Sequence, residues 1–196
     1  MKKYISALAA LLFIGSSIAF AGTSAPVKLN RNRINAIISE LQREARSGGS
    51  EGESESVRLP GITAVSGGDM DFVSIGGIGI SLIKIGAKHS DDDDAKAALA
   101  AFKGVKRLVV ADYEDSEPRV RERFNKKISA ALEGCEMLME AKDEGESIRI
   151  YGTPSADGSK INDIVVFSPE SGAFICMFGI IDADKIGEIA ETAGKR

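Results

Sequence analysis

Four short runs of strand-forming residues near the C-terminal end constrain the fold of this chain more than any other feature. They cover residues 136–142, 147–152, 161–168 and 173–181. The links between them are short and rich in turn residues, with the pair Asp157-Gly158 as the clearest hairpin signal. Strands joined by such short links pair antiparallel. The sequence therefore predicts a four-stranded antiparallel meander.

Helical and strand patterns alternate in the residues around this meander. We expect strands at 70–75 and 105–115 and helices at 91–104, 116–134 and 182–194, with a further helix as one interpretation of 81–90. Crossover helices must lie on a face of the sheet. The expected fold is therefore α+β, a two-layer sandwich in which a mixed, mainly antiparallel sheet carries its helices on one face.

The helix expected at 116–134 has the clearest boundary signals. Ser116 is placed as its cap, Pro118 falls in the first turn and Gly134 follows the end. The side chains predicted to be buried are Val120, Phe124, Ile128, Ala131 and Leu132. The cations between them are Arg119, Arg121, Arg123, Lys126 and Lys127. Glutamates interleave with these cations, which favours the interpretation that this face of the helix is simply exposed to solvent. The alternative is that it contacts an anionic envelope surface or an acidic partner.

The N-terminal part of the chain divides into a helix and a linker. Residues 29–46 place Ile34, Ile37, Ile38, Leu41 and Ala45 on one helical face, with Asn30 or Asn32 as cap. Residues 47–56 contain no apolar residue. We therefore expect a helix region at 22–46, a disordered linker at 47–58 and an α+β domain at 59–196. On this division the helix either packs on the domain or is offered to a partner.

The first 21 residues have the features of a secretory signal peptide. Lys2 and Lys3 precede the apolar run at 7–14. The small residues Ala19 and Ala21 then mark a cleavage site directly after Ala21. No later stretch is long and apolar enough for a transmembrane helix. These signals predict an exported protein, periplasmic or secreted.

Charge argues against nucleic acid as a partner. The chain carries a formal net charge of −4. Loss of Lys2 and Lys3 with the signal peptide makes the product more acidic by two charges. Nucleic-acid phosphates require a basic surface, so we expect no binding of nucleic acid.

Several segments resemble a known family. "FVSIGGIGISLIKIG", "KGVKRLVVADYED", "CEMLMEAKDEGESIRIYG", "INDIVVFS" and "MFGIIDADKIGEIA" follow one another as in the domain-of-unknown-function 4252 family, over residues 65–192. That family consists of small exported proteins of Gram-negative gut anaerobes. The resemblance implies an α+β domain behind a signal peptide, and the neighbouring genes of some members imply a link to envelope-stress signalling. It supplies no catalytic residues.

The glycine-rich run at 73–86 does not fit a nucleotide site. A dinucleotide fingerprint that starts at Gly77 and Gly79 would need a third glycine where Leu82 stands, and the Lys-Ser/Thr of a P-loop is absent. We interpret the glycines as a strand end with tight turns or close backbone packing.

Isolated catalytic and metal-binding motifs are also weak. Ser50 matches G-x-S-x-G only within the linker, where the elbow between a strand and a helix is missing. His89 is the only histidine, so we interpret it as a surface residue rather than part of a zinc site. The run at 91–94 lacks the alternating acids and glycine of an EF-hand and is explained by a helix N-terminus. We therefore expect no catalytic, metal-binding or cofactor-binding residues and no cofactor.

The two cysteines are predicted to stay reduced. Cys135 begins the first meander strand and Cys176 lies in the fourth, beside Phe174 and Phe178. If the strands pair in chain order, about 14 Å separates the first from the fourth. A disulfide needs Cα atoms within about 7 Å, so we expect two free thiols in apolar surroundings.

These patterns favour an exported, non-enzymatic module, periplasmic or envelope-associated, with a binding or regulatory role. Its expected partner is an unknown protein of the cell envelope, and the helix at 29–46 is a candidate docking element. One alternative is a hydrolase that uses carboxylates, although no sequence signal makes pairs such as Glu140 with Asp143, or Asp163 with Glu170, face each other. The other is a structural protein of the cell surface.

Overall fold

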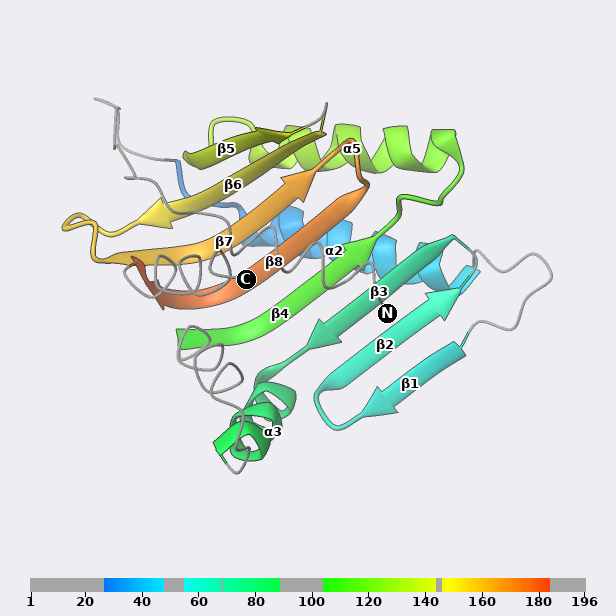
Figure 1. Ribbon diagram of the computed structural model, residues 1–196, viewed down its shortest axis with the longest axis horizontal. Helices are drawn as coiled ribbons and strands as arrows, with labels where there is room; N and C mark the ends of the chain where they lie inside the picture. Colours follow the sequence, from blue (N-terminus) through cyan, green and yellow to red (C-terminus); the bar gives the residue numbers. More distant parts are fainter. Residues whose placement is uncertain (1–26, 48–54, 68, 89–103, 144–145, 184–196) are drawn as a thin grey trace.

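One antiparallel sheet organises the part of the chain that the structure describes. The computed structural model describes residues 27–47, 55–67, 69–88, 104–143 and 146–183. Its strands are β1 (Glu55–Leu59), β2 (Ile62–Gly67), β3 (Met70–Ile75), β4 (Val105–Asp112), β5 (Met137–Asp143), β6 (Glu146–Pro154), β7 (Lys160–Ser168) and β8 (Ala173–Asp182). Their order across the sheet is β1-β2-β3-β4-β8-β7-β6-β5 (Figure 1).

The predicted meander is confirmed. Strands β5, β6, β7 and β8 are neighbours in chain order, and β8 then pairs with β4. The seven pairings between these described strands are all antiparallel, which confirms the expectation of a mainly antiparallel sheet. Three strand spacings separate Cys176 in β8 from β5, which follows Cys135, and both cysteines are free as predicted.

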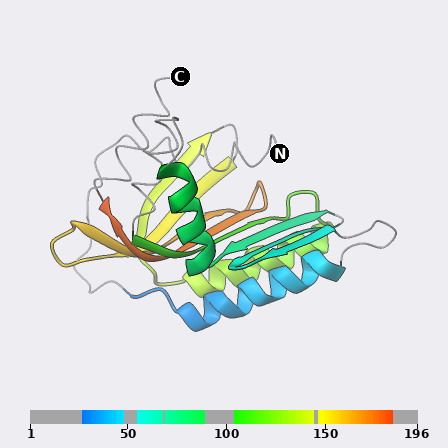
Figure 2. The same cartoon turned by 90° about the horizontal axis from the view of Figure 1, so that it is seen from below.

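Two of the described helices cover one face of the sheet. They are α2 (Arg31–Ser47) and α5 (Pro118–Leu132), which lie side by side (Figure 2). Helix α3 (Gly77–Lys88) lies on the opposite face, where the buried Ile80 joins a second apolar cluster. The α+β fold with its sheet-and-helix sandwich is therefore confirmed, with α3 as an addition on the second face.

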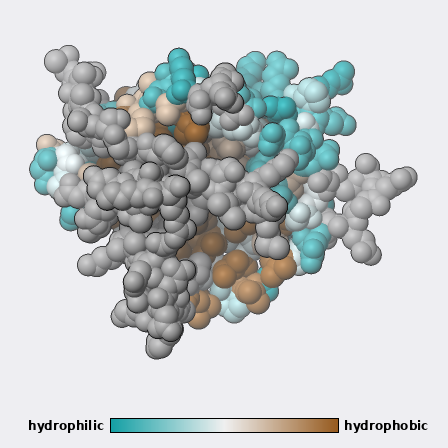
Figure 3. Space-filling view, viewed as in Figure 1, coloured by the Kyte–Doolittle hydropathy of each residue, from teal (hydrophilic) through white to brown (hydrophobic). Residues whose placement is uncertain are grey.

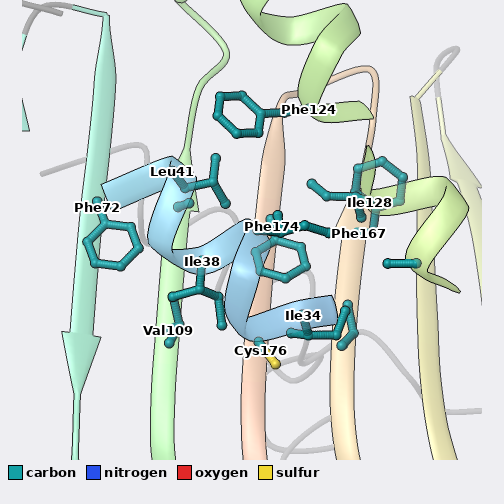
Figure 4. Packing of buried hydrophobic residues seen from close by; sticks show 14 of the residues in the cluster. Ile34, Ile38, Leu41, Phe72, Val109, Phe124, Ile128, Phe167, Phe174 and Cys176 are labelled. Atoms are coloured by element: carbon teal, nitrogen blue, oxygen red, sulfur yellow. The ribbon is translucent and has the colours of Figure 1, made fainter. Parts of the chain in front are cut away.

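The main core fills the space between the sheet and the pair α2 and α5. Side chains from both helices and from the central strands converge there, and Figure 4 shows Leu41, Phe72, Phe124, Phe167 and Phe174 among them. The predicted stripe of α2 is buried in full. Of the stripe predicted for α5, Val120 is half-buried against the core and the other four residues are buried.

The N-terminal helix is therefore part of the domain and not an appendage to it. Ile34, Ile38 and Leu41 of α2 expose 2% of their surface or less. They complete the same apolar cluster as Val109 of β4 and Phe174 of β8. Of the two alternatives left open for this helix, packing on the domain is the one that the structure shows, and the core therefore includes residues that precede the expected boundary at residue 59.

The start of the domain also differs from the expectation at the predicted linker. Residues 55–58, which we expected to be disordered, belong to β1, and β1 forms a hairpin with β2 through Pro60 and Gly61. Neither strand was predicted. Gly61 has a φ of 75°, which suits the third position of a type II turn after a proline. The remaining linker residues at 48–54 lie outside the described residues.

The N-cap of helix α5 lies one residue later than expected. Its N-cap is Glu117, which makes no side-chain capping hydrogen bond, and Pro118 occupies the first turn. The Ser116 hydroxyl instead donates to the carbonyl of Asp69 at 2.9 Å. Gly134 follows the helix with a φ of 75°, as predicted for the end signal.

Three expected segments fall on residues that the structure does not describe. The expected signal peptide at 1–21 lies entirely outside the described residues. The expected helices at 91–104 and 182–194 are included only through Gly104, Asp182 and Ala183, and Asp182 ends β8.

Candidate binding surface

The outer strand β1 forms one edge of the sheet, and no other described strand pairs with its outer side. All five of its residues are exposed, and Val57 and Leu59 expose 46% and 57% of their surface. A strand at the edge of a sheet has unpaired backbone N–H and C=O groups along its outer side. The edge therefore offers both hydrogen-bonding groups and apolar side chains.

Two rows of apolar side chains lead from this edge towards the centre of the sheet. One row consists of Leu59, Ile62, Ile75, Leu108 and Met177, which are paired in register across five strands. The other row consists of Val57, Ala64, Val73, Val110 and Ile175. Burial rises along both rows, from the exposed edge to the buried β8. The rows lie on the face opposite α2 and α5.

Helix α3 extends the apolar area beside the hairpin. Its exposed Ile78 and Leu82 leave 65% and 51% of their surface uncovered. Hydrophobic residues gather around the lower ends of β2 and β3 in the space-filling view (Figure 3). We call the exposed residues Val57, Leu59, Ile78 and Leu82, with the half-buried residues Ile62, Ala64, Val73 and Ile75, the edge surface.

The glycine-rich run fixes α3 against the hairpin turn. A Cβ on Gly79 would lie 2.7 Å from the Gly61 carbonyl oxygen and 2.9 Å from the Ile75 side chain, and Gly76 donates to the same Gly61 carbonyl at 2.7 Å. Only a residue without a Cβ permits this approach. The interpretation of these glycines as sites of close backbone packing is confirmed, and the helix begins at Gly77.

The opposite edge of the sheet is built differently. Strand β5 contains a register irregularity between Met137 and Met139, and its next residues include Glu140 and Lys142. Bulges and charged side chains are the usual means by which an edge strand is kept from pairing. Strand β1 also carries charged residues, Glu55 and Arg58, but its register with β2 is regular along its whole length, so of these two described edges it is the better template for an added strand.

A polar cluster at the start of α2 fastens this helix to the sheet. The buried Asp163 carboxylate of β7 accepts hydrogen bonds from Arg31 Nε at 2.6 Å, Arg31 Nη2 at 2.8 Å and the Gly179 amide at 2.9 Å. The bond to Asp163 raises the pKa of the Arg31 guanidinium. Asp163 has a φ of 51° and sits where the register of β7 shifts. Such a strained position persists only where the surrounding contacts hold it.

A second arginine completes this cluster. Arg107 of β4 donates to the Asn35 side-chain oxygen at 3.0 Å and to the Ser74 hydroxyl at 3.3 Å. The guanidinium carbons of Arg31 and Arg107 both lie within 6 Å of the centre of the Phe178 ring. Because these contacts join α2 to β3, β4 and β8, we assign the cluster to the attachment of the helix.

The half-buried Cys135 lies in an open depression at the end of α5. The depression has a volume of about 470 Å³, and its lining includes Cys135, Met137, Arg149 and Tyr151. Burial raises the pKa of the Cys135 thiol and that of the Tyr151 hydroxyl. A raised thiol pKa disfavours the nucleophilic thiolate. Cys176 is fully buried in the core, and burial raises its pKa as well.

The carboxylates considered for hydrolysis have separate partners. Glu140 pairs with Arg149 at 3.0 Å, and this bond holds the pKa of Glu140 below its usual range. Glu170 accepts from the Ser147 hydroxyl at 2.9 Å, whereas Asp163 pairs with Arg31. The side chain of Asp143 is outside the described residues, as are Ser50, His89 and the aspartates at 91–94. Among the described residues, no three His, Cys, Asp or Glu side chains form a group that could hold a metal.

A family pattern described as a domain of unknown function (DUF4252) matches residues 68–189 of the chain. The chain belongs to this family. The match covers β3 to β8 with α3 and α5, whereas α2, β1 and β2 precede it. The matched segment thus includes α3 and most of both apolar rows, whereas the edge strand β1 precedes it. No curated protein and no solved structure matches the chain.

Sequence reasoning missed the edge surface. The Pro60-Gly61 pair between Leu59 and Ile62 is a turn signal that could have revealed the hairpin. The polar residues before Val57 obscured it, because they made β1 resemble a continuation of the linker.

Within the described parts of the chain, no helix has the length and apolar character of a membrane crossing.

Proposed function

We propose that this protein is an exported, non-enzymatic binding module of the cell envelope, whose partner adds a strand to the β1 edge. The observation that carries the proposal is β1, a strand whose five residues are all exposed and which adjoins the rest of the apolar edge surface. Addition of an extended segment to a sheet edge is a common mode of peptide recognition, in which main-chain hydrogen bonds supply affinity and side chains supply specificity.

The geometry of β1 defines the segment that it would accept. Val57 and Leu59 point to the open face of the sheet, because they lie in register with Ala64 and Ile62. Ser56 lies in register with Val65, a residue of the main core, and therefore points to the helix side. A matching partner segment is extended, with apolar side chains at alternate positions that lie beside Val57 and Leu59.

The binding role thus moves from the N-terminal helix to the edge strand. The helix at 29–46 was the expected docking element, but burial of its apolar stripe leaves no such face free. Export and an envelope partner are supported by the N-terminal signal and by family resemblance, and a regulatory role would act through the same edge.

The test replaces a backbone donor on β1 without altering the core. Alternate residues of an antiparallel strand turn their N–H groups outward, and the two-residue turn after Leu59 assigns Ser56 and Arg58 to the outer side. Arg58→Pro removes an outward N–H, whereas the control Arg58→Ala retains it and also removes the charge. The mature wild-type protein and both variants are used to capture partners from envelope extract.

We expect one envelope protein to be captured by the wild type and by Arg58→Ala, and we expect Arg58→Pro not to capture it. In the complex, hydrogen exchange at residues 55–59 should slow by at least about tenfold, because the partner strand occupies the outer N–H groups. Equal capture by Arg58→Pro, or a complex that leaves exchange at β1 unchanged, would overturn the proposal. Thermal unfolding of each variant confirms that the fold is intact.

A further inference from the structure

The two helices that lie side by side on one face carry a charge opposite to that of the whole chain. Helices α2 and α5 together contain nine arginine and lysine residues and three glutamates, a net charge of +6. The chain as a whole has a net charge of −4, so the remaining residues carry −10. The fold therefore gathers positive charge into one layer, on the face away from the edge surface.

Some of these charges hold the two helices together. Arg123 of α5 pairs with Glu44 of α2 at 2.8 Å, and Lys127 pairs with Glu40. These contacts use both glutamates of α2, and α5 contributes only Glu122. The acidic groups within the layer are thus mostly engaged in the seam between the helices.

Other cations of the layer face outward. Arg43, Arg119 and Lys126 are exposed and lie on the sides of their helices opposite the buried stripes. None of the three makes an ion pair with another described residue. With Arg33 and Arg46, which are also exposed, they distribute positive charge along both helices.

The same layer lacks the apolar anchors of a protein interface. The large exposed hydrophobic residues of the described chain belong to other segments, and none lies in α2 or α5. Protein interfaces are built around buried apolar and aromatic side chains. A bilayer with anionic headgroups requires only positive charge at its surface and attracts each nearby cation by about 1 kcal/mol.

We propose that the outer face of α2 and α5 is an electrostatic docking surface for an anionic lipid bilayer. The contact is peripheral, because the layer offers no apolar side chain for insertion. Docking by this face leaves the β1 edge surface, on the other face of the sheet, directed away from the lipid. The proposal does not depend on a strand-binding role of β1.

Vesicle co-sedimentation of the purified mature protein tests this surface. Vesicles of phosphatidylcholine alone are compared with vesicles that contain phosphatidylglycerol, at about 0.01 M and about 0.1 M salt, between which the screening length falls about threefold. The variant Arg43→Glu/Arg119→Glu/Lys126→Glu reverses three outward cations of the layer. The control Lys106→Glu/Lys142→Glu/Lys160→Glu reverses three exposed cations outside these two helices and has the same net charge.

We expect the wild type and the control to bind anionic vesicles at low salt, to bind less at higher salt and to ignore neutral vesicles. The helix-layer variant should lose more than about 100-fold in partitioning, since three cations are reversed. Equal loss in both variants would show a net-charge effect and overturn the proposal, as would no anionic preference in the wild type. Binding of the wild type to polyglutamate but not to anionic vesicles would assign the face to an acidic protein instead, and would also overturn it.

Discussion

At the scale of single residues, Asp163 is the polar side chain that fastens the start of α2 to the sheet. Its buried carboxylate accepts three hydrogen bonds from Arg31 and Gly179, and two of these come from a guanidinium. The position also requires a φ of 51°, which aspartate and asparagine tolerate better than other side chains with a Cβ. A substitution to asparagine therefore changes the charge while it preserves the backbone preference.

We expect Asp163→Asn to lower the free energy of unfolding by about 1.5–3 kcal/mol, the range for hydrogen bonds to charged groups. The exposure of Arg31 keeps the effect below that of a fully buried pair. Urea unfolding measures the change, and the exposed Asp182→Asn serves as control. A loss as small as that of the control would show that the cluster contributes little to holding α2.

A second prediction concerns the contact between α3 and the hairpin turn. The Cβ introduced by Gly79→Ala would meet a backbone oxygen and two isoleucine side chains within 3 Å, so α3 or the turn must shift. The neighbouring Gly77→Ala meets only the Lys106 carbonyl oxygen, at 3.9 Å. We expect Gly79→Ala to destabilise the protein by about 1–3 kcal/mol. Gly77→Ala should change stability by less than about 1 kcal/mol.

Urea unfolding of the two glycine variants, with the wild type, makes this comparison. If both variants were equally stable, α3 would not be held against Gly61 as described, and the position of Ile78 beside the hairpin would lose its basis.

At the scale of secondary-structure elements, the sequence predicted those parts of the fold that depend on local signals. The meander followed from short links and alternating apolar residues, and the buried stripes of α2 and α5 followed from helical periodicity. Prediction of free cysteines depended on the chain-order pairing of β5 to β8, which the structure confirms. Each of these features is determined by residues close together in the chain.

The parts that sequence could not predict depend on contacts between distant segments. Strand β1 has no buried side chain, so its pattern carries no core-facing signal, and it is defined by its register with β2. The stripe of α2 indicates burial but not the surface that covers it, which comes from β2, β3 and α5 among other segments. The cluster around Asp163 depends on the contact between Arg31 and Asp163, which are 132 positions apart in the chain.

Deletion of α2 tests its place in the core. Ile34, Ile37, Ile38 and Leu41 are all buried, and burial of such side chains contributes about 1.5–3 kcal/mol each, an amount that together approaches the entire stability of a typical domain. We expect a chain that starts at residue 55 to lose cooperative thermal unfolding, whereas a chain that starts at residue 27 retains it. A cooperative transition in the shorter chain would restore the domain boundary near residue 59.

At the scale of the whole molecule, the two faces of the sheet differ in character. One face is covered by α2 and α5, whose outer surface is basic, and the other leads through apolar rows to an exposed strand edge. This separation permits one molecule to contact an anionic surface and a protein segment at the same time. The binding of a partner strand at β1 is the central claim about its role.

Site-specific photo-crosslinking in cells of the source organism tests that claim most directly. A photoreactive amino acid replaces the exposed Val57 of β1 or, as control, the exposed Lys160 at the start of β7. We predict that position 57 crosslinks to one envelope protein, within an extended segment that has apolar residues at alternate positions, and that position 160 does not. Crosslinks from position 57 to other residues of its own chain only, or the same products from both positions, would contradict the assignment of β1 as a binding edge.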